Sequence, residues 1–238
     1  METTEKETRN WYREYYLKKG KDRNDLLTNP EVLCQHLAVE DSVISALRRP
    51  TNLNRETSRI LDVGCGGGGS LTRFLQLGFQ PDNLYGLDML QERIDEGKRK
   101  YPNLNLICGN ATSMTFESDM FDLVLESTMF VQITDEELSQ KISQEMLRVT
   151  KPRGYLMLID WRYGKPGNSN YLAVSMKRIN KMFSVGSLSD VICQTRGALV
   201  PPVGRAASKY LPSMYFLLGA IFPFLIGLKT TLLQKRNV

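Results

Sequence analysis

Short apolar runs alternate with amphipathic stretches from Ser58 onward, at the interval expected for strand–helix–strand units. The runs that predict strands are bounded by glycine, asparagine or aspartate and cover residues 59–63, 84–88, 104–108, 121–126 and 155–160. The amphipathic stretches predict helices over residues 70–77, 91–100 and 135–149. Because strands joined through helices need crossover connections, this pattern predicts an α/β fold with a doubly wound, mostly parallel sheet and helices on both faces.

Local signals place some helix ends and show where the pattern weakens. Thr134 and Glu137 have the spacing of a capping box, and Pro152 ends the same helix. Pro30 marks a helix start within the first 57 residues. Beyond Asp160 the alternation weakens, and a loop over residues 164–170 leads to a helix predicted over 171–183.

The composition is that of a globular chain, since 42% of the 238 residues are hydrophobic and 24% are charged. It excludes a disordered or collagenous protein. The four cysteines form no C-x-x-C pair, which predicts neither a zinc ribbon nor a disulfide framework. A charged N-terminus without an apolar run predicts no cleaved secretory signal and a cytoplasmic location. The net charge of +5 is too mild an excess to predict a nucleic-acid partner.

The strongest chemical signal is a glycine-rich turn between the first predicted strand and the first predicted helix. Residues 60–70 read Ile-Leu-Asp-Val-Gly-Cys-Gly-Gly-Gly-Gly-Ser, a context in which backbone amides can approach a ligand closely. The spacing Gly64, Gly66, Gly69 also fits a dinucleotide fingerprint, with Asp88 where a ribose-binding acid belongs. Asp62 separates the two interpretations, because a carboxylate beside the loop repels a pyrophosphate and favours a cationic ligand.

Asp62, Gly64, Gly66 and Gly68 resemble the first motif of the class I S-adenosylmethionine-dependent methyltransferases, an acid followed by G-x-G-x-G. The resemblance extends over about residues 58–160. It implies S-adenosylmethionine as cofactor and a Rossmann-like, seven-stranded sheet with an antiparallel last strand. Residues 229–234 would then form that last strand, and residues 198–200 would belong to the sixth.

The same resemblance assigns cofactor contacts at the ends of three further strands. Asp88 would bind the ribose hydroxyls, and Met89 would line the adenine face. Asn110 and Ala111 stand where many members have Gly-Asp-Ala, and the Asn110 side-chain oxygen could still accept the adenine amine hydrogen bond. Glu126 would face the methionine part of the cofactor.

Methyl transfer is an in-line displacement that depends mainly on alignment, so the family has no universal catalytic residue. Asp160, at the end of the fifth predicted strand, and His36, the one histidine, are the two candidates for a general base. The segment after Glu126 lacks the Asp/Asn-Pro-Pro-aromatic motif of DNA amino-methylases, which excludes that nucleic-acid substrate class. No paired acids follow Asp160, so no metal site is predicted.

Two segments are expected to surround the acceptor. Residues 1–57 predict an N-terminal helical lid, and residues 58–238 predict the methyltransferase core with an insertion at about 164–228. Residues 210–228 carry no charge. They fit an apolar helix over the acceptor pocket, a segment lying on a membrane surface, or a membrane span.

These features lead to a methyltransferase acting on a small-molecule or sugar/glycan hydroxyl, carried on a lipid if residues 210–228 contact the acceptor or a membrane. Two alternatives stay open. One is a methyltransferase of a lipid or quinone-like acceptor at the membrane surface, and the other is a non-catalytic S-adenosylmethionine-binding regulatory module.

Overall fold

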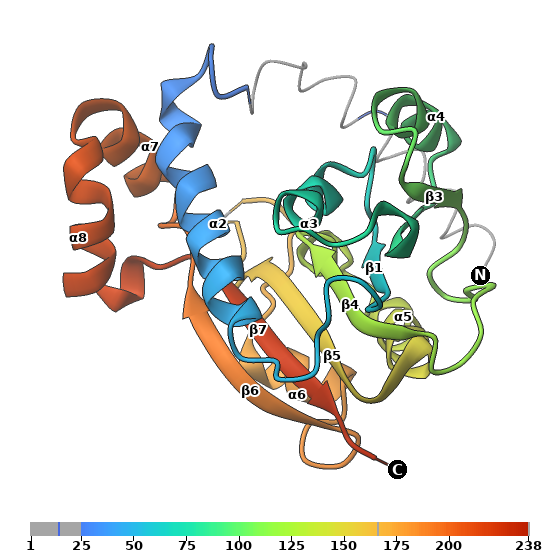
Figure 1. Cartoon of the computed structure of the whole chain (residues 1–238). Coiled ribbons are helices and arrows are strands. Elements are labelled where there is room, and N and C mark those ends of the chain that lie inside the picture. Colours follow the sequence, from blue (N-terminus) through green and yellow to red (C-terminus); the bar gives the residue numbers. More distant parts are fainter. Residues whose placement is uncertain (1–13, 15–24, 166, 238) are drawn as a thin grey trace.

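The computed structural model describes residues 14, 25–165 and 167–237, and within them seven strands form one sheet in the order β3-β2-β1-β4-β5-β7-β6 (Figure 1). The strands are β1 (Ile60–Val63), β2 (Leu84–Asp88), β3 (Asn105–Cys108), β4 (Phe121–Ser127), β5 (Thr150–Trp161), β6 (Ser189–Arg196) and β7 (Leu228–Lys235). β1 to β5 are parallel, and β7 runs antiparallel to both neighbours, β5 and β6. The predicted doubly wound, mostly parallel sheet with an antiparallel last strand is confirmed.

Helices cover both faces of the sheet, as the strand–helix alternation predicts. One face packs against α2 (Leu33–Leu47), α3 (Thr72–Gln76) and α4 (Gln91–Lys100), and the other against α5 (Glu136–Val149) and α6 (Met176–Met182). Successive β4 residues alternate between the two cores: Leu123 and Leu125 pack toward α3, and Val124 packs toward α5. The central strands are therefore buried on both sides, and ligands have access only at their ends.

α5 ends where predicted, at Val149, but its N-cap and the start of β5 are corrected. Its N-cap is Asp135, not Thr134, because the Asp135 carboxylate accepts hydrogen bonds from the backbone N–H groups of Glu137 and Leu138, at 2.8 and 3.1 Å. The helix ends at Val149, and β5 begins at once with Thr150. Pro152 therefore lies inside a strand that starts five residues earlier than predicted.

The sixth strand was predicted in the wrong place. β6 covers Ser189–Arg196, whereas Leu199 makes only an isolated bridge to Ile226. β6 is an edge strand with half of its residues exposed, and its apolar run at residues 191–193 is no longer than the run at residues 198–200, so the sequence did not distinguish the two. The helix predicted over 171–183 is likewise shorter, because α6 begins at Met176 after an N-cap at Ser175.

The apolar segment 210–228 is broken into short pieces rather than forming one helix. After α7 (Pro201–Tyr210) come η6 (Pro212–Met214), α8 (Tyr215–Ile221) and η7 (Pro223–Leu225), and a proline opens each of the two 3₁₀ turns. None of the helices among the described residues has the length and apolar character needed to cross a membrane. Of the three alternatives for residues 210–228, the membrane span therefore has no support in the described part of the chain.

α2 belongs to the core rather than to a separate lid. It lies beside α7 and over β6 and β7 (Figure 1), and its buried Ser42 hydroxyl bonds the hydroxyls of Thr195 on β6 and Thr230 on β7, at 2.9 and 2.7 Å. A third apolar cluster joins Cys34 and Ala38 of α2 to Ala207 of α7. The aromatic and basic part of the predicted lid, residues 11–24, lies almost entirely outside the described residues.

Candidate functional site

The glycine-rich turn after β1 adopts a backbone shape that other residues would strain. Gly64, Gly66 and Gly68 have φ values of +75°, +56° and +80°. A Cβ atom at Gly64 would lie 2.9 Å from the Met129 sulfur, and one at Gly66 would lie 2.8 Å from an Arg93 nitrogen. The positive φ values therefore favour glycine at all three positions, whereas the close contacts at Gly64 and Gly66 are with the ends of the Met129 and Arg93 side chains, which can move. At Gly68 the chain turns into the following 3₁₀ helix, η3 (Gly69–Leu71).

Asp88, the last residue of β2, fixes this turn. One carboxylate oxygen accepts the backbone N–H of Gly66 at 2.8 Å, and the other accepts the backbone N–H of Leu90 at 2.9 Å. The same carboxylate thus holds the glycine turn and the residue that precedes α4. Because it is held from two sides, its position does not depend on a ligand.

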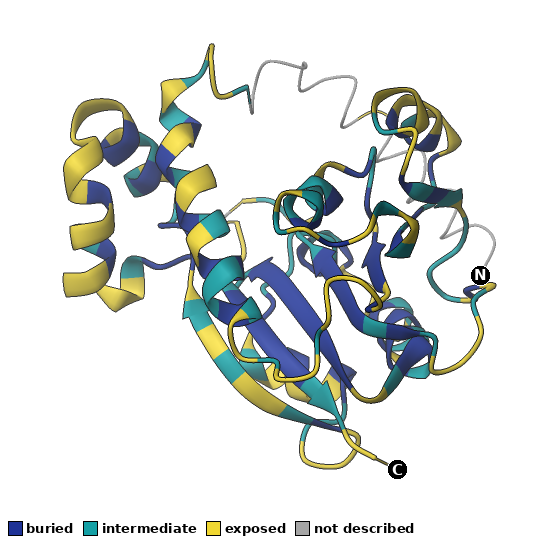
Figure 2. Ribbon diagram, viewed as in Figure 1, coloured by how far each residue is buried: buried dark blue, intermediate teal, exposed yellow. Residues whose placement is uncertain are grey.

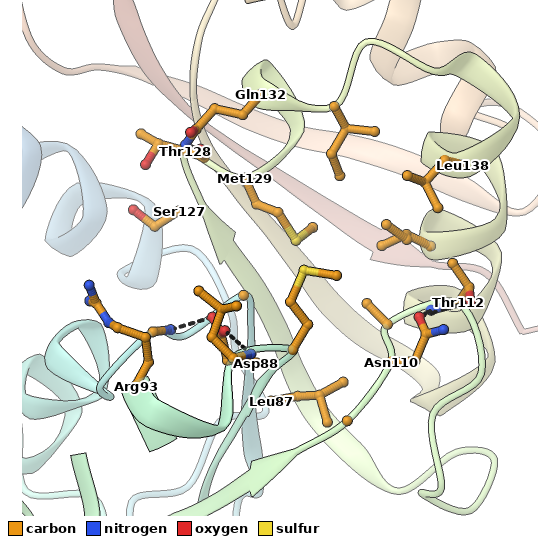
Figure 3. A pocket seen from close by; sticks show the side chains of 18 residues that line it. Leu87, Asp88, Arg93, Asn110, Thr112, Ser127, Thr128, Met129, Gln132 and Leu138 are labelled. Atoms are coloured by element: carbon orange, nitrogen blue, oxygen red, sulfur yellow. Dashed lines mark hydrogen bonds between the residues drawn. The ribbon is translucent and has the colours of Figure 1, made fainter. Parts of the chain in front are cut away.

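A cavity opens above the carboxyl ends of β1, β2 and β4, with Asp88 at its centre between Arg93 and Asn110 (Figure 3). Counted to its open mouth, it encloses about 910 Å³, enough for a nucleoside-sized ligand. The structure brings together six of the predicted cofactor-binding residues in its wall: Gly64, Gly66, Asp88, Met89, Asn110 and Ala111. Asp62, Gly68 and Glu126 do not line it.

Asn110 is more constrained than its sequence position indicated. Its side-chain oxygen accepts hydrogen bonds from both the backbone N–H and the hydroxyl of Thr112, each at 2.9 Å. A carbonyl oxygen has two lone pairs, so accepting an adenine amine there would require one of these bonds to open. The predicted adenine contact of Asn110 stays a prediction.

The opposite wall comes from residues that the sequence did not single out. These are Ser127, the last residue of β4, and Thr128, Met129 and Gln132, which follow it. Met129 points into the cavity (Figure 3). Thr128 has φ +57°, a rare conformation for a β-branched residue, and its N–H donates to Ile159 O at 2.9 Å. No local sequence signal predicts this strained turn, because it depends on the neighbouring strand β5.

Asp62 is a buried carboxylate beneath the glycine turn. It is 1% exposed, and neither oxygen has a hydrogen-bond partner among the described residues. Burial raises the pKa of Asp62 to about 7, although the nearby Arg73 guanidinium opposes this shift. Arg73 itself pairs with Glu40 of α2, with Nε 2.6 Å from a carboxylate oxygen. Asp62 therefore acts on the cavity from behind its wall.

A pair of buried acids, Glu126 and Asp160, lies where β4 and β5 end, on the face of the sheet covered by α5 and α6. Asp160 accepts the N–H groups of Val131 and Trp161 at 2.9 and 2.7 Å, and Glu126 accepts the N–H of Met129 at 2.9 Å. Burial, followed by the proximity of Asp160, raises the pKa of Glu126, and burial raises the pKa of Asp160 to about 7. Through these bonds the pair holds the backbone on either side of Phe130, next to the wall residues Met129 and Gln132.

Asp160 also lines a second cavity, of about 600 Å³ when counted to its open mouth in the same way, at the same edge of the sheet. Its wall is formed by the ends of β5, β6 and β7 and by α6: Leu158, Asp160, Arg162, Val174, Ser175, Met176, Ile179, Gln194, Lys229 and Thr231. Of the two candidate bases, the structure thus places Asp160 beside a cavity. His36 lies exposed on α2 and lines neither cavity. Residues 201–228 line neither cavity either, so the predicted apolar helix over a pocket is not observed there.

Comparisons with known proteins agree with this architecture. Residues 60–154 match the family model described as "Methyltransferase domain". A demethylmenaquinone methyltransferase of Renibacterium salmoninarum is 32% identical over 105 residues, covering 44% of this chain and 42% of the relative. A fatty-acid O-methyltransferase of Mycolicibacterium smegmatis is 33% identical over 111 residues, covering 45% and 38% of the respective chains. The chain spans about two fifths of the length of such curated relatives.

The similarity in fold covers more of the chain than the similarity in sequence does. The crystal structure of geranyl diphosphate C-methyltransferase from Streptomyces coelicolor, in complex with S-adenosyl-L-homocysteine, superposes with a TM-score of 0.61 at 14% identity. It covers 84% of this chain and 80% of the other. At this identity the likeness concerns the fold alone.

The buried carboxylate of Asp62 predicts a distinct pH dependence of stability. Its pKa is about 7 in the folded state against 3.8 as the ordinary value, so between these pH values the folded state holds the extra proton. The free energy of unfolding should therefore fall as pH rises from about 4 to about 7, by roughly 2–4 kcal/mol from this group. Asp62→Asn should remove that part of the fall, so the variant is more stable than wild type at pH 8.

Urea unfolding of the ligand-free protein at pH 5 and pH 8 measures this difference. Asp95→Asn, at an exposed position on α4, is the matched control and should retain the wild-type pH dependence. Identical pH dependence in both variants would show that Asp62 is charged in the folded state throughout.

Proposed function

We propose that the protein is a class I S-adenosylmethionine-dependent methyltransferase that transfers a methyl group to a small-molecule acceptor, because residues 60–154 match the methyltransferase domain model and the fold is that of such enzymes. The observation that carries the proposal is the positive-φ glycine turn held by Asp88 at the centre of an open cavity. When bound, S-adenosylmethionine supplies a sulfonium methyl group: its C–S bond breaks, a bond from carbon to the acceptor oxygen forms, a thioether leaves, and the hydroxyl proton is released.

The residues of the first cavity fit this cofactor. Each Asp88 oxygen already accepts one backbone N–H and can accept a further hydrogen bond, which suits two ribose hydroxyls. Met89 and Ala111 supply apolar wall for an adenine ring, and the glycines let a ligand approach the backbone. The hydrogen-bond acceptors of Asp88 and the apolar wall are thus already in place, which supports binding without a movement of β1 or β2.

The buried acids support a cationic ligand rather than a pyrophosphate. Asp62 and Glu126 lie behind the wall, each with at least one carboxylate oxygen that has no hydrogen-bond partner among the described residues. A positive charge in the cavity would favour their ionised forms, and two negative phosphates would oppose them. We therefore assign them an electrostatic role toward the sulfonium and ammonium groups, in place of the direct contact expected from sequence.

Asp160 is the better candidate for the base. It borders the second cavity, close behind the wall of the first, and its pKa of about 7 suits proton transfer near neutral pH. Its two hydrogen bonds from backbone N–H groups hold the carboxylate in place. A hydroxyl in the second cavity could thus pass its proton to Asp160.

Among acceptors, the structure favours a lipid-like molecule over a free sugar. The relatives include enzymes named for demethylmenaquinone and for a fatty acid as acceptor. In this chain, exposed apolar side chains are frequent from the end of α7 through α8 and the two 3₁₀ turns beside it, segments whose ribbon is mostly exposed in Figure 2. We call Tyr210, Leu211, Met214, Phe216, Leu217, Ile221, Phe222 and Phe224 the apolar surface.

Methyl transfer is tested with isotopically labelled S-adenosylmethionine, a panel of fatty acids, quinols and sugars, and mass spectrometry of the products. Asp88→Ala should weaken binding of the demethylated cofactor by about 2–3 kcal/mol, the scale of charge-assisted hydrogen bonds. Asp95→Ala, outside the cavity, should bind normally. Wild-type cofactor binding without any labelled product would favour a regulatory module, and unchanged binding by Asp88→Ala would place the ribose elsewhere.

The apolar surface also supports contact with an anionic membrane, in keeping with a lipid acceptor. The chain has no acidic residue after Asp190 and six basic ones. Lys209, Lys235 and Arg236 form ion pairs with acidic residues elsewhere in the chain, which leaves Arg196, Arg205 and Lys229 as excess positive charge. Exposed aromatic side chains together with cations are typical of proteins that lie on such surfaces.

Flotation with vesicles tests this contact. Vesicles containing phosphatidylglycerol should retain the protein, and vesicles of phosphatidylcholine alone should retain less. The double variant Phe216→Ser, Phe224→Ser should lose roughly tenfold or more in partitioning, because each buried Phe contributes about 1.5–3 kcal/mol. Leu188→Ser, which changes an exposed apolar residue next to β6, is the control. Equal partitioning of all three proteins contradicts the proposal.

A further inference from the structure

The second cavity has a distribution of charge that points to one part of the acceptor. Resting on the proposed methyltransferase function, and deepening it, we propose that this cavity holds an oxyanionic group of an amphiphilic acceptor, a carboxylate or a phosphate monoester. The anion serves as an anchor at the outer end of the cavity. The methylated group is a separate one, nearer Asp160.

The pairing of β5, β7 and β6 arranges the residues of the cavity in two rows. Lys229 of β7 lies opposite Asp160 on one side and Arg196 on the other. Two residues further along β7, Thr231 lies opposite Leu158 of β5 and Gln194 of β6. Directly paired residues share a face of the sheet. The polar side chains of three strands are therefore presented to α6, which closes the cavity from the opposite side.

Positive charge accumulates at the outer end of these rows. Burial, and then the proximity of Arg162 and Arg196, lowers the pKa of Lys229. The Lys229 ammonium donates to the Gln194 side-chain oxygen at 3.4 Å, and Arg162 donates to the carbonyl oxygens of residues 223 and 224 at 2.8 and 3.1 Å. No carboxylate within the described ranges forms an ion pair with any of these three cations.

An anion between these cations would relieve their mutual repulsion. The Nε of Arg162 is buried without a hydrogen-bond partner in the described structure, so the guanidinium also has an unused donor. Arg and Lys together can bind a carboxylate or phosphate through charge-assisted hydrogen bonds. Asp160 disfavours an anion at the inner end, which fixes the orientation of the acceptor along the cavity.

The cation cluster also adjoins the apolar surface. Arg162 binds the backbone of η7, and the Tyr163 hydroxyl donates to Phe224 O at 3.0 Å. An alkyl or prenyl chain attached to the anion could thus leave the cavity along exposed apolar side chains. This continuity is the reason to commit to an amphiphilic anion rather than to a free inorganic ion.

Calorimetry on the full chain saturated with S-adenosyl-L-homocysteine tests the proposal. The three probes, octanoate, octyl phosphate and 1-octanol, carry the same alkyl chain and differ in their head group. At least one of the two anions should bind roughly tenfold or more tightly than the alcohol, with an affinity that falls as salt rises. The tighter anion identifies the group. Equal affinity of all three probes would overturn the proposal.

Three variants locate the site. Lys229→Met and Arg196→Gln should each weaken binding of the preferred anion about tenfold and leave octanol binding unchanged. Lys181→Met removes a cation on the exposed side of α6 and should bind the anion normally. Arg196 lies exposed on an edge strand, so its variant remains informative if Lys229→Met fails to fold.

The experiments distinguish a failure of the proposed methyltransferase function from a failure of the proposed anion site. If the protein does not bind S-adenosyl-L-homocysteine, the proposed function fails, whatever the anions do. If it binds S-adenosyl-L-homocysteine but Lys181→Met weakens anion binding as much as Lys229→Met, only the anion site is refuted.

Discussion

The Asp88 carboxylate connects two segments that the sheet alone would leave apart. Its hydrogen bonds to the N–H groups of Gly66 and Leu90 fix the glycine turn against the start of α4. This turn also needs the positive φ angles of Gly64, Gly66 and Gly68, a conformation that residues with a Cβ atom rarely adopt. The cavity, its donors and its access to solvent all follow from this one constraint at the carboxyl end of the parallel strands.

Charged side chains are distributed unevenly around Asp88 and the two cavities. Three buried carboxylates lie near the carboxyl ends of the strands, Asp62 and Glu126 behind the wall of the first cavity and Asp160 in the wall of the second, and desolvation raises the pKa of each. Cations collect further out, at the ends of β5, β6 and β7. Such an arrangement favours a positive cofactor group near the buried acids and a negative acceptor group near the cations, so electrostatics alone can orient both reactants.

The sequence predicts the parts of this arrangement that local patterns encode. β1 is buried at every residue, and its apolar run followed by glycines predicted both the strand and the loop that lines the cavity. β6 was misplaced because it is a half-exposed edge strand whose short apolar run is not followed by a comparable glycine signal. The positive φ of Thr128 and the row formed by Asp160 and Lys229 depend on contacts between strands distant in sequence, for which no local signal exists.

The central claim is that the cavity around Asp88 is built for a cationic nucleoside ligand rather than for a dinucleotide. Calorimetry of the purified chain with S-adenosyl-L-methionine, and in a parallel titration with NADH, tests it most directly. The account predicts that S-adenosyl-L-methionine binds with micromolar affinity and that NADH gives no measurable binding, because the buried carboxylates oppose its pyrophosphate. Tight binding of NADH, with weak or absent binding of S-adenosyl-L-methionine, would contradict the account.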